Sequence, residues 1–242
     1  MQAIFHFTQA TDLRSIRDRL SAEFGRIRDE ERFDPVSQFV CSFLGSRTYD
    51  QTSWNAFARL VRHYRSWDAI ADAPEAGIRA IIWDVTYSEK KAPDLQRALR
   101  KIRACAGAID LTFLADWPVE QALLWLERIH GVGRKIAAAT LNFSTLRGRA
   151  FVVDTHVLRV LRRFGFVGAN AATEDAYDGV MAAADDFDAD DLFELHWHLK
   201  RLGQKACSHG WAVCVFCPLS DICLRRVEEG AIMVALASAC AA

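Results

Sequence analysis

Four of the seven cysteines lie within 17 residues, in the spacing Cys207-x6-Cys214-x2-Cys217-x5-Cys223. Four thiolates on one short segment form a donor set for a soft metal centre. Zinc is the common occupant of four-cysteine sites, and a [4Fe–4S] cluster also takes four cysteines. The spacing by itself leaves zinc and the cluster open, and with all four ligands from protein the site is expected to be structural.

A second chemically suggestive segment is Leu126–Ala137, with the sequence LERIHGVGRKIA. Gly131, Val132 and Gly133 predict a tight turn with uncovered backbone amides, and a helix is expected to begin at about Arg134. Bare amides beside a helix N-terminus can bind phosphate without reading a base sequence. A Gly-x-Gly turn taken alone is nevertheless more typical of an ordinary helix-to-helix connection.

Lys135 stands at the start of that second helix, and Asp154 lies 19 residues further along. The positive helix end and the neighbouring Arg134 would lower the pKa of a lysine, as burial would. A neutral amine can attack a sugar carbon and form a Schiff base. Taken alone, Lys135 is more typical of a phosphate contact and Asp154 of a helix cap.

Composition narrows the class of protein. The chain has 242 residues, 51% hydrophobic and 25% charged, with a net charge of −1. This mixture indicates a globular fold and excludes a disordered chain. No apolar run reaches the length of about 20 residues that a membrane helix needs, and the N-terminus lacks a secretory h-region. We therefore expect a cytoplasmic protein, where cysteine thiols stay reduced.

The elements that must position these groups are predicted to be helical. Four prolines stand where helices would begin, and apolar residues recur three or four apart after them. The only candidate strand is Arg149–Val153, and a terminal helix is expected over Arg225–Ala239. The stretch 128–163 holds eight Lys or Arg and one acid, but charge alone favours an ordinary solvated face.

In this order, GVGRKIA, VDTHVLR and the four-cysteine spacing resemble the endonuclease III family of DNA glycosylases, within the helix-hairpin-helix superfamily. The resemblance implies an all-α fold of two lobes with a DNA-binding cleft between them. One six-helix lobe would span 35–147, and the other would combine 1–34 with 148–242. The latter lobe would carry a [4Fe–4S] cluster on Cys207, Cys214, Cys217 and Cys223, which makes zinc the less favoured metal.

The resemblance also implies the chemistry. Lys135 matches the family's catalytic lysine and Asp154 its catalytic aspartate. The enzyme would flip a damaged nucleotide out of duplex DNA, and Lys135 would attack C1′ and displace the base. Asp154 would support the charge that develops on the sugar, and the imine would allow strand cleavage by β-elimination. Related adenine glycosylases typically lack this lysine, so Lys135 argues for combined glycosylase and lyase activity.

Several positions depart from the family pattern. Arg47 replaces a glutamine that fills the space left by the flipped base, and it could bond an orphaned guanine or only a phosphate. Tyr87 matches a wedge leucine and could stack on bases or lie in the core. His130 replaces a proline and could add a phosphate contact or merely end a helix. DNA contacts are also expected from His156 and from the hairpin residues, Gly131, Val132, Gly133 and Arg134.

Three alternatives stay open at this point. A monofunctional enzyme for uracil or a mispaired base would use Asp154 to activate water. A lesion-binding protein would have lost catalysis, and a zinc-stabilised helical scaffold would have no DNA role. The expected partner is duplex DNA with a damaged or mispaired pyrimidine or an abasic site, bound by a monomer.

Overall fold

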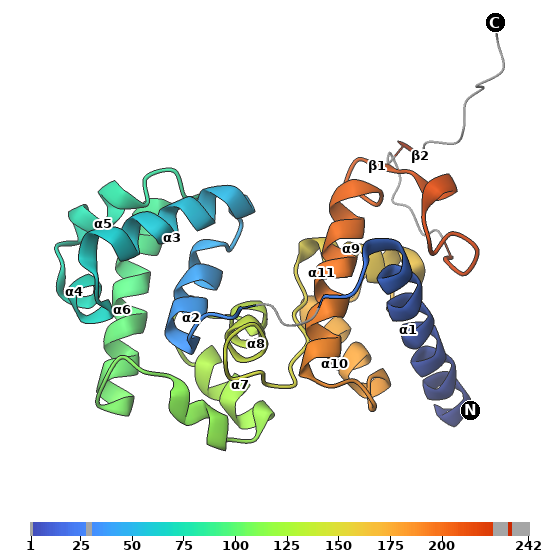
Figure 1. Ribbon diagram of the computed structural model, residues 1–242, viewed down its shortest axis with the longest axis horizontal. Coiled ribbons are helices and arrows are strands. Elements are labelled where there is room, and N and C mark those ends of the chain that lie inside the picture. Colours follow the sequence, from blue (N-terminus) through green and yellow to red (C-terminus); the bar gives the residue numbers. More distant parts are fainter. Residues whose placement is uncertain (1, 28–30, 225–231, 234–242) are drawn as a thin grey trace, which may run out of the picture. The chain divides into compact units, whose positions relative to one another are not determined.

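The computed structural model describes residues 2–27, 31–224 and 232–233 of the chain, and the regular secondary structure of this part is almost entirely helical (Figure 1). The predicted all-α fold class is thereby confirmed. Within these residues, no helix is both long enough and apolar enough to cross a membrane.

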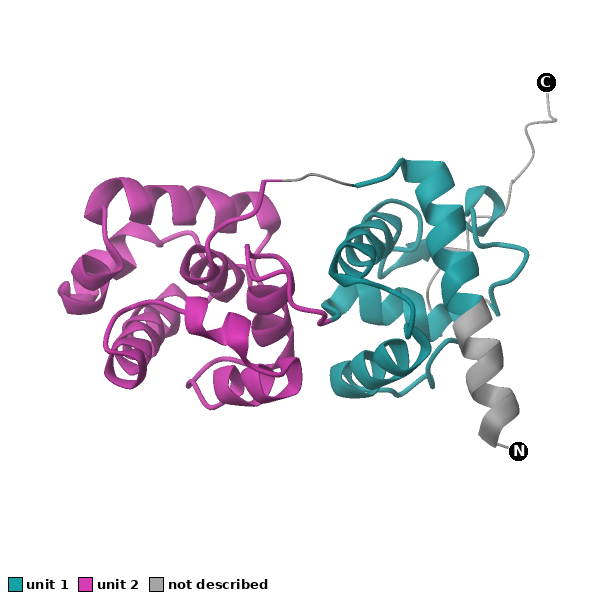
Figure 2. Ribbon diagram, turned by 60° about the horizontal axis from the view of Figure 1, so that its bottom comes forward, with its two compact units in different colours: residues 1–30, 151–242 teal, residues 31–150 magenta. Residues whose placement is uncertain are grey.

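The chain divides into two compact units, coloured separately in Figure 2. One consists of residues 31–150 and is called the central unit below. The other combines 1–30 with 151–242 and is called the terminal unit. The sequence resemblance implied division at 34/35 and 147/148, a few residues from these limits.

The central unit holds seven α-helices and one 3-10 helix among its described residues, where six helices were expected. Helix α8 packs against α2 and α7, and α6 packs against α4 and α5. The elements are α2 (Pro35–Leu44), α3 (Asp50–Tyr64), α4 (Trp67–Asp72), α5 (Glu75–Ile81), α6 (Ser88–Ala106), η1 (Thr112–Asp116), α7 (Val119–Glu127) and α8 (Arg134–Asn142).

Helix α2 begins where the sequence indicates. The Asp34 carboxylate accepts from the amides of Val36 and Ser37, each at 3.0 Å, and Pro35 occupies the first helical position. The helix then buries most of its length, including Phe39, in the unit's core. Capping and burial thus act together to fix α2, against which α8 is placed.

Helix α6 begins earlier than its proline predicts. Pro93 lies inside α6, which starts at Ser88 after Tyr87 in a left-handed conformation. Pro93 is the sixth residue of α6 and has no N–H to donate to the Glu89 carbonyl, a cost that burial of Lys91 and Ala92 in the preceding turn offsets. Tertiary packing therefore extends the helix beyond the signal in its sequence.

The terminal unit is built around α11, which packs against α1 and α9. The candidate strand Arg149–Val153 does not form: residues 150–153 are buried but pair with no strand among the described residues. The elements are α1 (Gln2–Phe24), α9 (Thr155–Phe164), α10 (Thr173–Ala183), α11 (Ala189–Lys205), β1 (Trp211–Ala212), η2 (Cys214–Phe216) and β2 (Ile232–Met233).

The terminal helix expected over Arg225–Ala239 falls mostly outside the described residues. The two described residues within it, Ile232 and Met233, form β2 and pair in parallel with β1, so the helical prediction is wrong at these positions.

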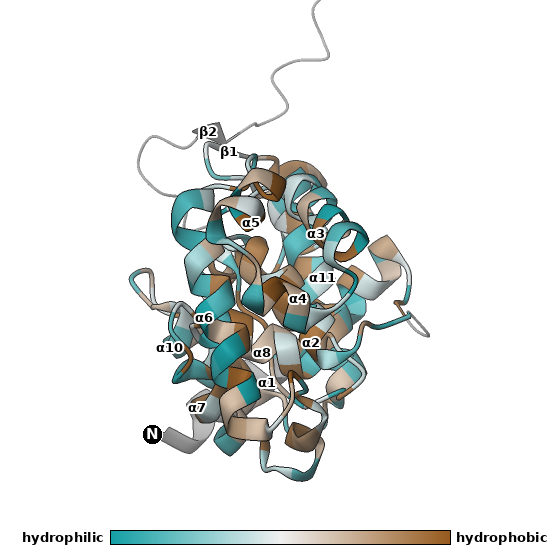
Figure 3. Cartoon of the chain, turned by 90° about the vertical axis from the view of Figure 1, so that its left-hand side faces the viewer, coloured by the Kyte–Doolittle hydropathy of each residue, from teal (hydrophilic) through white to brown (hydrophobic). Residues whose placement is uncertain are grey.

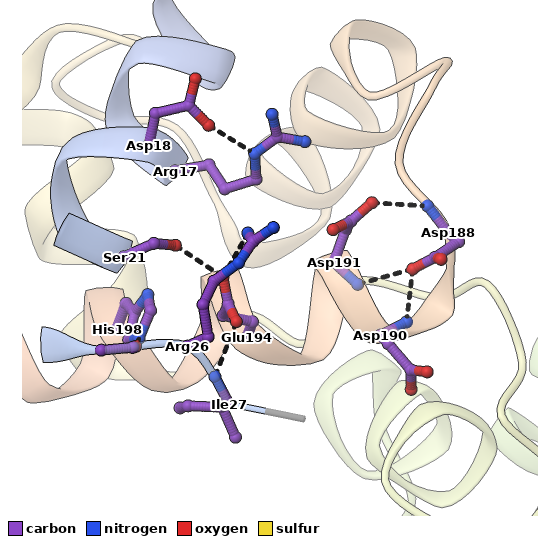
Figure 4. Close-up of polar contacts among 11 residues, drawn as sticks. Arg17, Asp18, Ser21, Arg26, Ile27, Asp188, Asp190, Asp191, Glu194 and His198 are labelled. Carbon is purple, nitrogen blue, oxygen red and sulfur yellow. Dashed lines mark hydrogen bonds and ion pairs between the residues drawn. The ribbon is translucent and has the colours of Figure 1, made fainter. Parts of the chain in front are cut away.

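A buried carboxylate ties the N-terminal segment to α11 (Figure 4). Glu194 is fully buried and accepts from the Ser21 hydroxyl at 2.6 Å and from the Ile27 amide at 2.7 Å. Arg26 donates to the same carboxylate at 3.2 Å, and His198 bonds the Gly25 carbonyl at 2.9 Å. The segment that follows α1 is therefore fixed to α11 by polar contacts as well as by packing.

Hydrophilic and hydrophobic positions alternate along the helices (Figure 3). This pattern is the amphipathic arrangement expected when each helix buries one face in its own unit. Helix α9 illustrates it, because Val157, Val160, Leu161 and Phe164 are all buried.

Candidate functional site

The predicted hairpin is present between α7 and α8. Gly131 has φ +81°, a left-handed conformation that favours glycine. A Cβ at Gly131 would stand 3.2 Å from the Phe43 ring, so space as well as backbone geometry selects glycine. The side chain of Val132, between the two glycines, is buried and so fixes the turn to the core of the central unit.

Gly133 differs from Gly131 in both respects. It caps α8 in ordinary extended geometry, with φ −109° and ψ 179°, and a Cβ there would meet nothing within 4 Å. Neither space nor strain within the described residues requires glycine at this position. The open approach to the first amides of α8 is the feature that a phosphate site needs.

Lys135 lies in the first turn of α8 and is partly buried. The adjacent Arg134 donates from Nε to Glu127, on the last turn of α7, and so braces the two helices of the hairpin. The side chain of Arg134, which was expected to contact DNA, is therefore already engaged in an ion pair within the hairpin.

A second lysine lies near Lys135. Lys91 is 8% exposed, and burial together with the charge of Lys135 lowers the pKa of Lys91 to about 8. Its Nζ donates to the Leu44 carbonyl at 2.8 Å, to Thr48 Oγ1 at 3.1 Å and to the Ser46 carbonyl. Sequence reasoning missed Lys91. The only indication in the sequence was that this lysine stands at helical spacing from apolar residues that are buried in α6.

Lys91 connects the two loops that carry the expected wedge residues. Thr48 also accepts from the Thr86 amide at 3.2 Å, so the loop around Arg47 and the loop before Tyr87 are joined at two points. Arg47 is exposed, Tyr87 is 52% exposed, and both have left-handed backbones with φ of 54° and 60°. Tyr87 is therefore not a core tyrosine.

His130 is also displayed at the surface of the central unit. Its side chain is 64% exposed, and its Nε2 lies 3.6 Å from Oδ1 of Asp94. Asp94 is buried and also pairs with Arg97. His130 thus stands next to the hairpin glycines with one ring edge toward a carboxylate.

Asp154 belongs to the terminal unit and caps α9. Its Oδ1 accepts from the amides of His156 at 2.8 Å and Val157 at 2.9 Å, so the capping role is confirmed. Its Oδ2 lies 4.0 Å from Lys200 Nζ. One carboxylate oxygen is thus used by the helix, while the other faces a cation.

The ionisation of Asp154 follows from these neighbours. Burial raises the pKa of Asp154. The charges of His196 and Lys200 and the hydrogen bond from the Val157 amide together lower it by more, so the net pKa is below 3.8. His196 is itself held by a 2.7 Å bond to the Val152 carbonyl. Asp154 therefore remains an anion at neutral pH, as a group that supports a developing positive charge must.

Sequence reasoning missed His196 and Lys200. Both lie on the buried side of α11 and are separated from Asp154 by more than 40 positions, so no local motif links them. The signal in the sequence was their position within an apolar run that includes Leu195 and Leu199. His156, which was expected to contact DNA, bonds Arg159 through Nδ1 at 3.1 Å.

The four cysteines of the 207–223 segment are not joined in disulfides and are of intermediate exposure. Burial, and then the negative charges of Cys207, Cys223 and Cys214, raise the pKa of Cys217 to about 11, so these thiols lie near enough to influence one another. As placed, no three His, Cys, Asp or Glu side chains in the described ranges are grouped to hold a metal ion.

Arginines of α9 hold the cysteine segment. Arg163 is 2% exposed and donates to Cys207 Sγ at 3.4 Å, to the Ser208 carbonyl at 2.7 Å and to the His209 carbonyl at 3.1 Å. Arg159 Nε donates to the Cys207 carbonyl at 2.9 Å. Three of the eight Lys or Arg in the 128–163 stretch, Arg159, Arg162 and Arg163, therefore donate to backbone carbonyls of other segments.

Comparison with known proteins places this arrangement in a family. Residues 40–182, more than half of the chain, match the model of the HhH-GPD superfamily base excision DNA repair protein. The chain is 25% identical over 215 residues to endonuclease III of Sulfolobus acidocaldarius, covering 82% of this chain and 92% of that one.

A protein of Arabidopsis thaliana that carries the name DNA glycosylase is 27% identical over 151 residues, and the chain covers 51% of its length. Among solved structures, a trapped endonuclease III–DNA covalent intermediate matches the fold with a TM-score of 0.72 at 20% identity, over 88% of this chain and 95% of that one. The hairpin and the helical fold agree with the family match, which shows that the chain, similar to endonuclease III over most of its length, belongs to the HhH-GPD superfamily of base excision DNA repair proteins.

Proposed function

We propose that this protein is a DNA glycosylase that removes damaged or mispaired pyrimidines from duplex DNA and then cleaves the strand as an AP lyase. The observation that carries the proposal is the position of Lys135, in the first turn of α8 directly after the open turn of Gly131–Gly133. A strand phosphate bound by those amides would bring a sugar carbon toward the lysine. The endonuclease III whose structure has a similar fold was trapped as a covalent intermediate with DNA.

In the proposed reaction, neutral Lys135 attacks C1′ of the flipped nucleotide, and the C1′–N bond breaks with the electron pair leaving on the base, which takes up a proton. The nitrogen lone pair of the secondary amine then opens the sugar ring to a protonated imine, and O4′ takes up a proton. Loss of a C2′ proton then breaks the C3′–O bond, and the strand on the 3′ side leaves with its phosphate. Asp154, an anion opposite Lys200 and His196, supplies negative charge for the positively charged sugar.

Arg47 and Tyr87 are the proposed wedge. Both are exposed on loops of the central unit joined through Lys91 and Thr48, which supports a shared role at the flipped nucleotide's former position. Arg47 would bond the orphaned base, with guanine matching its two-pronged donor pattern, and Tyr87 would stack on a neighbouring base.

Borohydride trapping tests the lyase. Duplexes carry an abasic site, uracil, thymine glycol or a mispaired thymine, each opposite guanine or adenine. We expect a covalent adduct with wild type and with Lys101→Ala, an exposed lysine on α6, and none with Lys135→Ala. The duplex that traps best identifies the substrate. Adduct formation that persists in Lys135→Ala would contradict the proposed nucleophile.

A monofunctional glycosylase is the second candidate, favoured by the ionised state of Asp154, whose Oδ2 is not used in capping α9. In that reaction Asp154 would activate water and Lys135 would only bind DNA. Base release assayed separately from strand cleavage distinguishes the two. Release that survives in Lys135→Ala but is lost in Asp154→Asn supports the monofunctional enzyme over the lyase.

We further propose a [4Fe–4S] cluster on Cys207, Cys214, Cys217 and Cys223. The spacing of the four cysteines supports the proposal, and the Arg163 guanidinium, which donates to Cys207 Sγ, would offset the negative charge of a sulfur-ligated cluster. The four sulfur atoms are not grouped around one centre in the described residues, so cluster binding would have to draw them together. Such a site would secure the segment after α11 and is expected to be structural. Iron and sulfide analysis of protein purified without oxygen should give about four of each per chain. A colourless protein with one zinc would contradict it, and Cys217→Ser should lose the iron.

A further inference from the structure

A basic pocket of about 480 Å³ lies in the central unit, and none of its lining residues belongs to the hairpin. It is formed where the ends of α3 and α5 meet the segment that leads to Tyr87, and Figure 1 shows these helices as neighbours. Its lining consists of Arg59, Arg62, His63, Arg65, Ala80, Ile81 and Trp83.

Only part of the positive charge that lines the pocket is engaged by hydrogen bonds or ion pairs within the described residues. Arg59 is engaged, because its Nε donates to the Ile81 carbonyl at 2.9 Å and its Nη2 pairs with Asp84. Arg62 and Arg65 are exposed, and within the described part of the chain neither side chain has an ion pair or hydrogen bond. The lining contains no acidic residue. Two arginines therefore remain available to an external anion.

Helix ends alone do not account for this pocket. Cations in the last turn of a helix are stabilised by its terminal carbonyls, and Arg62 and His63 occupy that position in α3. The helix-end effect does not explain why Trp83, a large aromatic residue that is 70% exposed, lines the same pocket as these charged residues. An exposed indole next to two available guanidinium groups matches a ligand with a flat aromatic face and a phosphate.

The pocket is connected by a short, anchored segment to the proposed wedge. Trp83 precedes Tyr87 by four residues, a reach of at most ~14 Å. Asp84 is held by Arg59, Val85 is buried, and the Thr86 amide bonds Thr48. Because a DNA strand advances about 3.4 Å per nucleotide, a strand contacting Tyr87 can extend to Trp83 within about four nucleotides.

We propose that this pocket binds a nucleotide of a DNA strand, with the phosphate between Arg62 and Arg65 and an unpaired base stacked on Trp83. The inference rests on the proposed action on DNA and adds a site for strand DNA beyond the hairpin and the wedge loops. An unpaired base is required because a paired one would not offer its face to the indole. Substrates with a single-stranded stretch near the lesion are therefore favoured.

Binding of a fluorescein-labelled ten-nucleotide oligothymidylate, measured by anisotropy over a range of salt, tests the pocket. Trp83→Ala should weaken binding about 5- to 50-fold, and Trp83→Phe should restore most of it. Arg65→Gln should lower the slope of log K against log salt by about 0.7, whereas the control Lys101→Gln, with an exposed lysine on α6, should not. Thermal melts establish that each variant is folded.

Two outcomes would overturn the proposal. Oligothymidylate binding that is unchanged in Trp83→Ala and Arg65→Gln excludes the pocket as its site. Competition by a polyglutamate peptide that equals competition by unlabelled oligothymidylate, with no effect of Trp83→Ala, would instead indicate a surface for acidic protein segments.

Borohydride trapping on the abasic duplex at saturating enzyme separates this proposal from the proposed function. An adduct in wild type together with unchanged oligothymidylate binding in the pocket variants means that the pocket proposal fails and the lyase stands. If wild type forms no adduct and the pocket variants bind oligothymidylate more weakly, the pocket proposal stands and the lyase proposal fails.

Discussion

Among individual residues, the two glycines of the hairpin serve different purposes. Gly131 is required by its left-handed backbone and by Phe43, whereas Gly133 has open space and ordinary dihedral angles. A sequence motif that contains both therefore combines a folding requirement with an open approach to the amides of α8. Paired alanine substitutions separate the two.

Gly131→Ala is expected to destabilise the protein by about 1–2 kcal/mol, because a Cβ at positive φ is strained and also approaches Phe43. Gly133→Ala is expected to change stability by less than about 0.5 kcal/mol. Its methyl group would hinder a phosphate at the first amides of α8, with a loss of about 1.5–3 kcal/mol in DNA binding for one charged hydrogen bond. Urea unfolding and binding to an abasic duplex measure both. Unaltered DNA affinity in Gly133→Ala would show an ordinary turn.

Asp154 also combines two roles, as helix cap and as anion. Asp154→Asn keeps an acceptor for the amides of His156 and Val157 but removes the charge that faces Lys200. We expect base release to fall by about 10²-fold or more, and we expect some loss of stability because His196 and Lys200 would no longer face an anion. Asp154→Ala should lose, in addition, about 1 kcal/mol of stability with the cap. Single-turnover kinetics and urea unfolding test this; equal activity in Asp154→Asn and wild type would exclude a role for the charge.

At the scale of elements, Lys91 joins structures that local sequence does not connect. It extends from the first turns of α6 to the carbonyl end of α2 and to the following loop, and so fixes the loops of Arg47 and Tyr87 to each other. Two exposed residues in left-handed conformations are held by one buried side chain. The geometry of the proposed wedge thus depends on a residue that is not expected to touch DNA.

Lys91→Met keeps the length of the side chain but leaves the Leu44 and Ser46 carbonyls and Thr48 without this donor. We expect a loss of about 1–3 kcal/mol of stability and a reduced preference for one opposite base. Lys90→Met, a change at the exposed neighbour, is the matched control. Urea unfolding and base release opposite guanine and adenine provide the readouts. Unchanged stability and opposite-base preference in Lys91→Met would refute this positioning role.

At the scale of the molecule, the N-terminal helix joins the end of the chain in one compact unit. Helix α11 provides the contact through packing against α1 and through the fully buried Glu194. Burial raises the pKa of Glu194, but bonds from Ser21 and Ile27 lower it more, so the net pKa is below 4.5. Burial likewise lowers the pKa of His198 below 6.5.

Both shifts predict loss of stability on acidification. A depressed folded-state pKa contributes stability above the unfolded value, and this is lost as the pH falls through the folded value. The His198 contribution is complete above about pH 6.5 and that of Glu194 above about pH 4.5. Glu194→Gln should cost about 1.5–3 kcal/mol at pH 7 and should flatten the acid limb of the stability profile. Urea unfolding from pH 7 to pH 3.5 checks this against Glu23→Gln, at an exposed site of α1. An unchanged acid limb in Glu194→Gln would contradict the assignment.

The helical fold class, the hairpin turn at Gly131 and the cap of α9 by Asp154 could be predicted from the sequence. These features are local: Asp34 caps α2 two and three residues ahead, and Gly131 sets the turn through its own φ. The same locality explains the errors. Arg149–Val153 has strand-like residues without a neighbouring strand, and Pro93 lies within a helix whose earlier turn is stabilised by burial.

The partners that complete the site follow from tertiary packing alone. Lys91 meets carbonyls more than 40 positions away, and Lys200 faces Asp154 across a similar separation. Arg163 looked like part of a basic stretch but binds the cysteine segment. Hydrogen bonds and ion pairs of this kind depend on distances set by packed helices. Residue spacing along the chain does not determine those distances, because a side chain meets its partner only after both helices are buried against a common core.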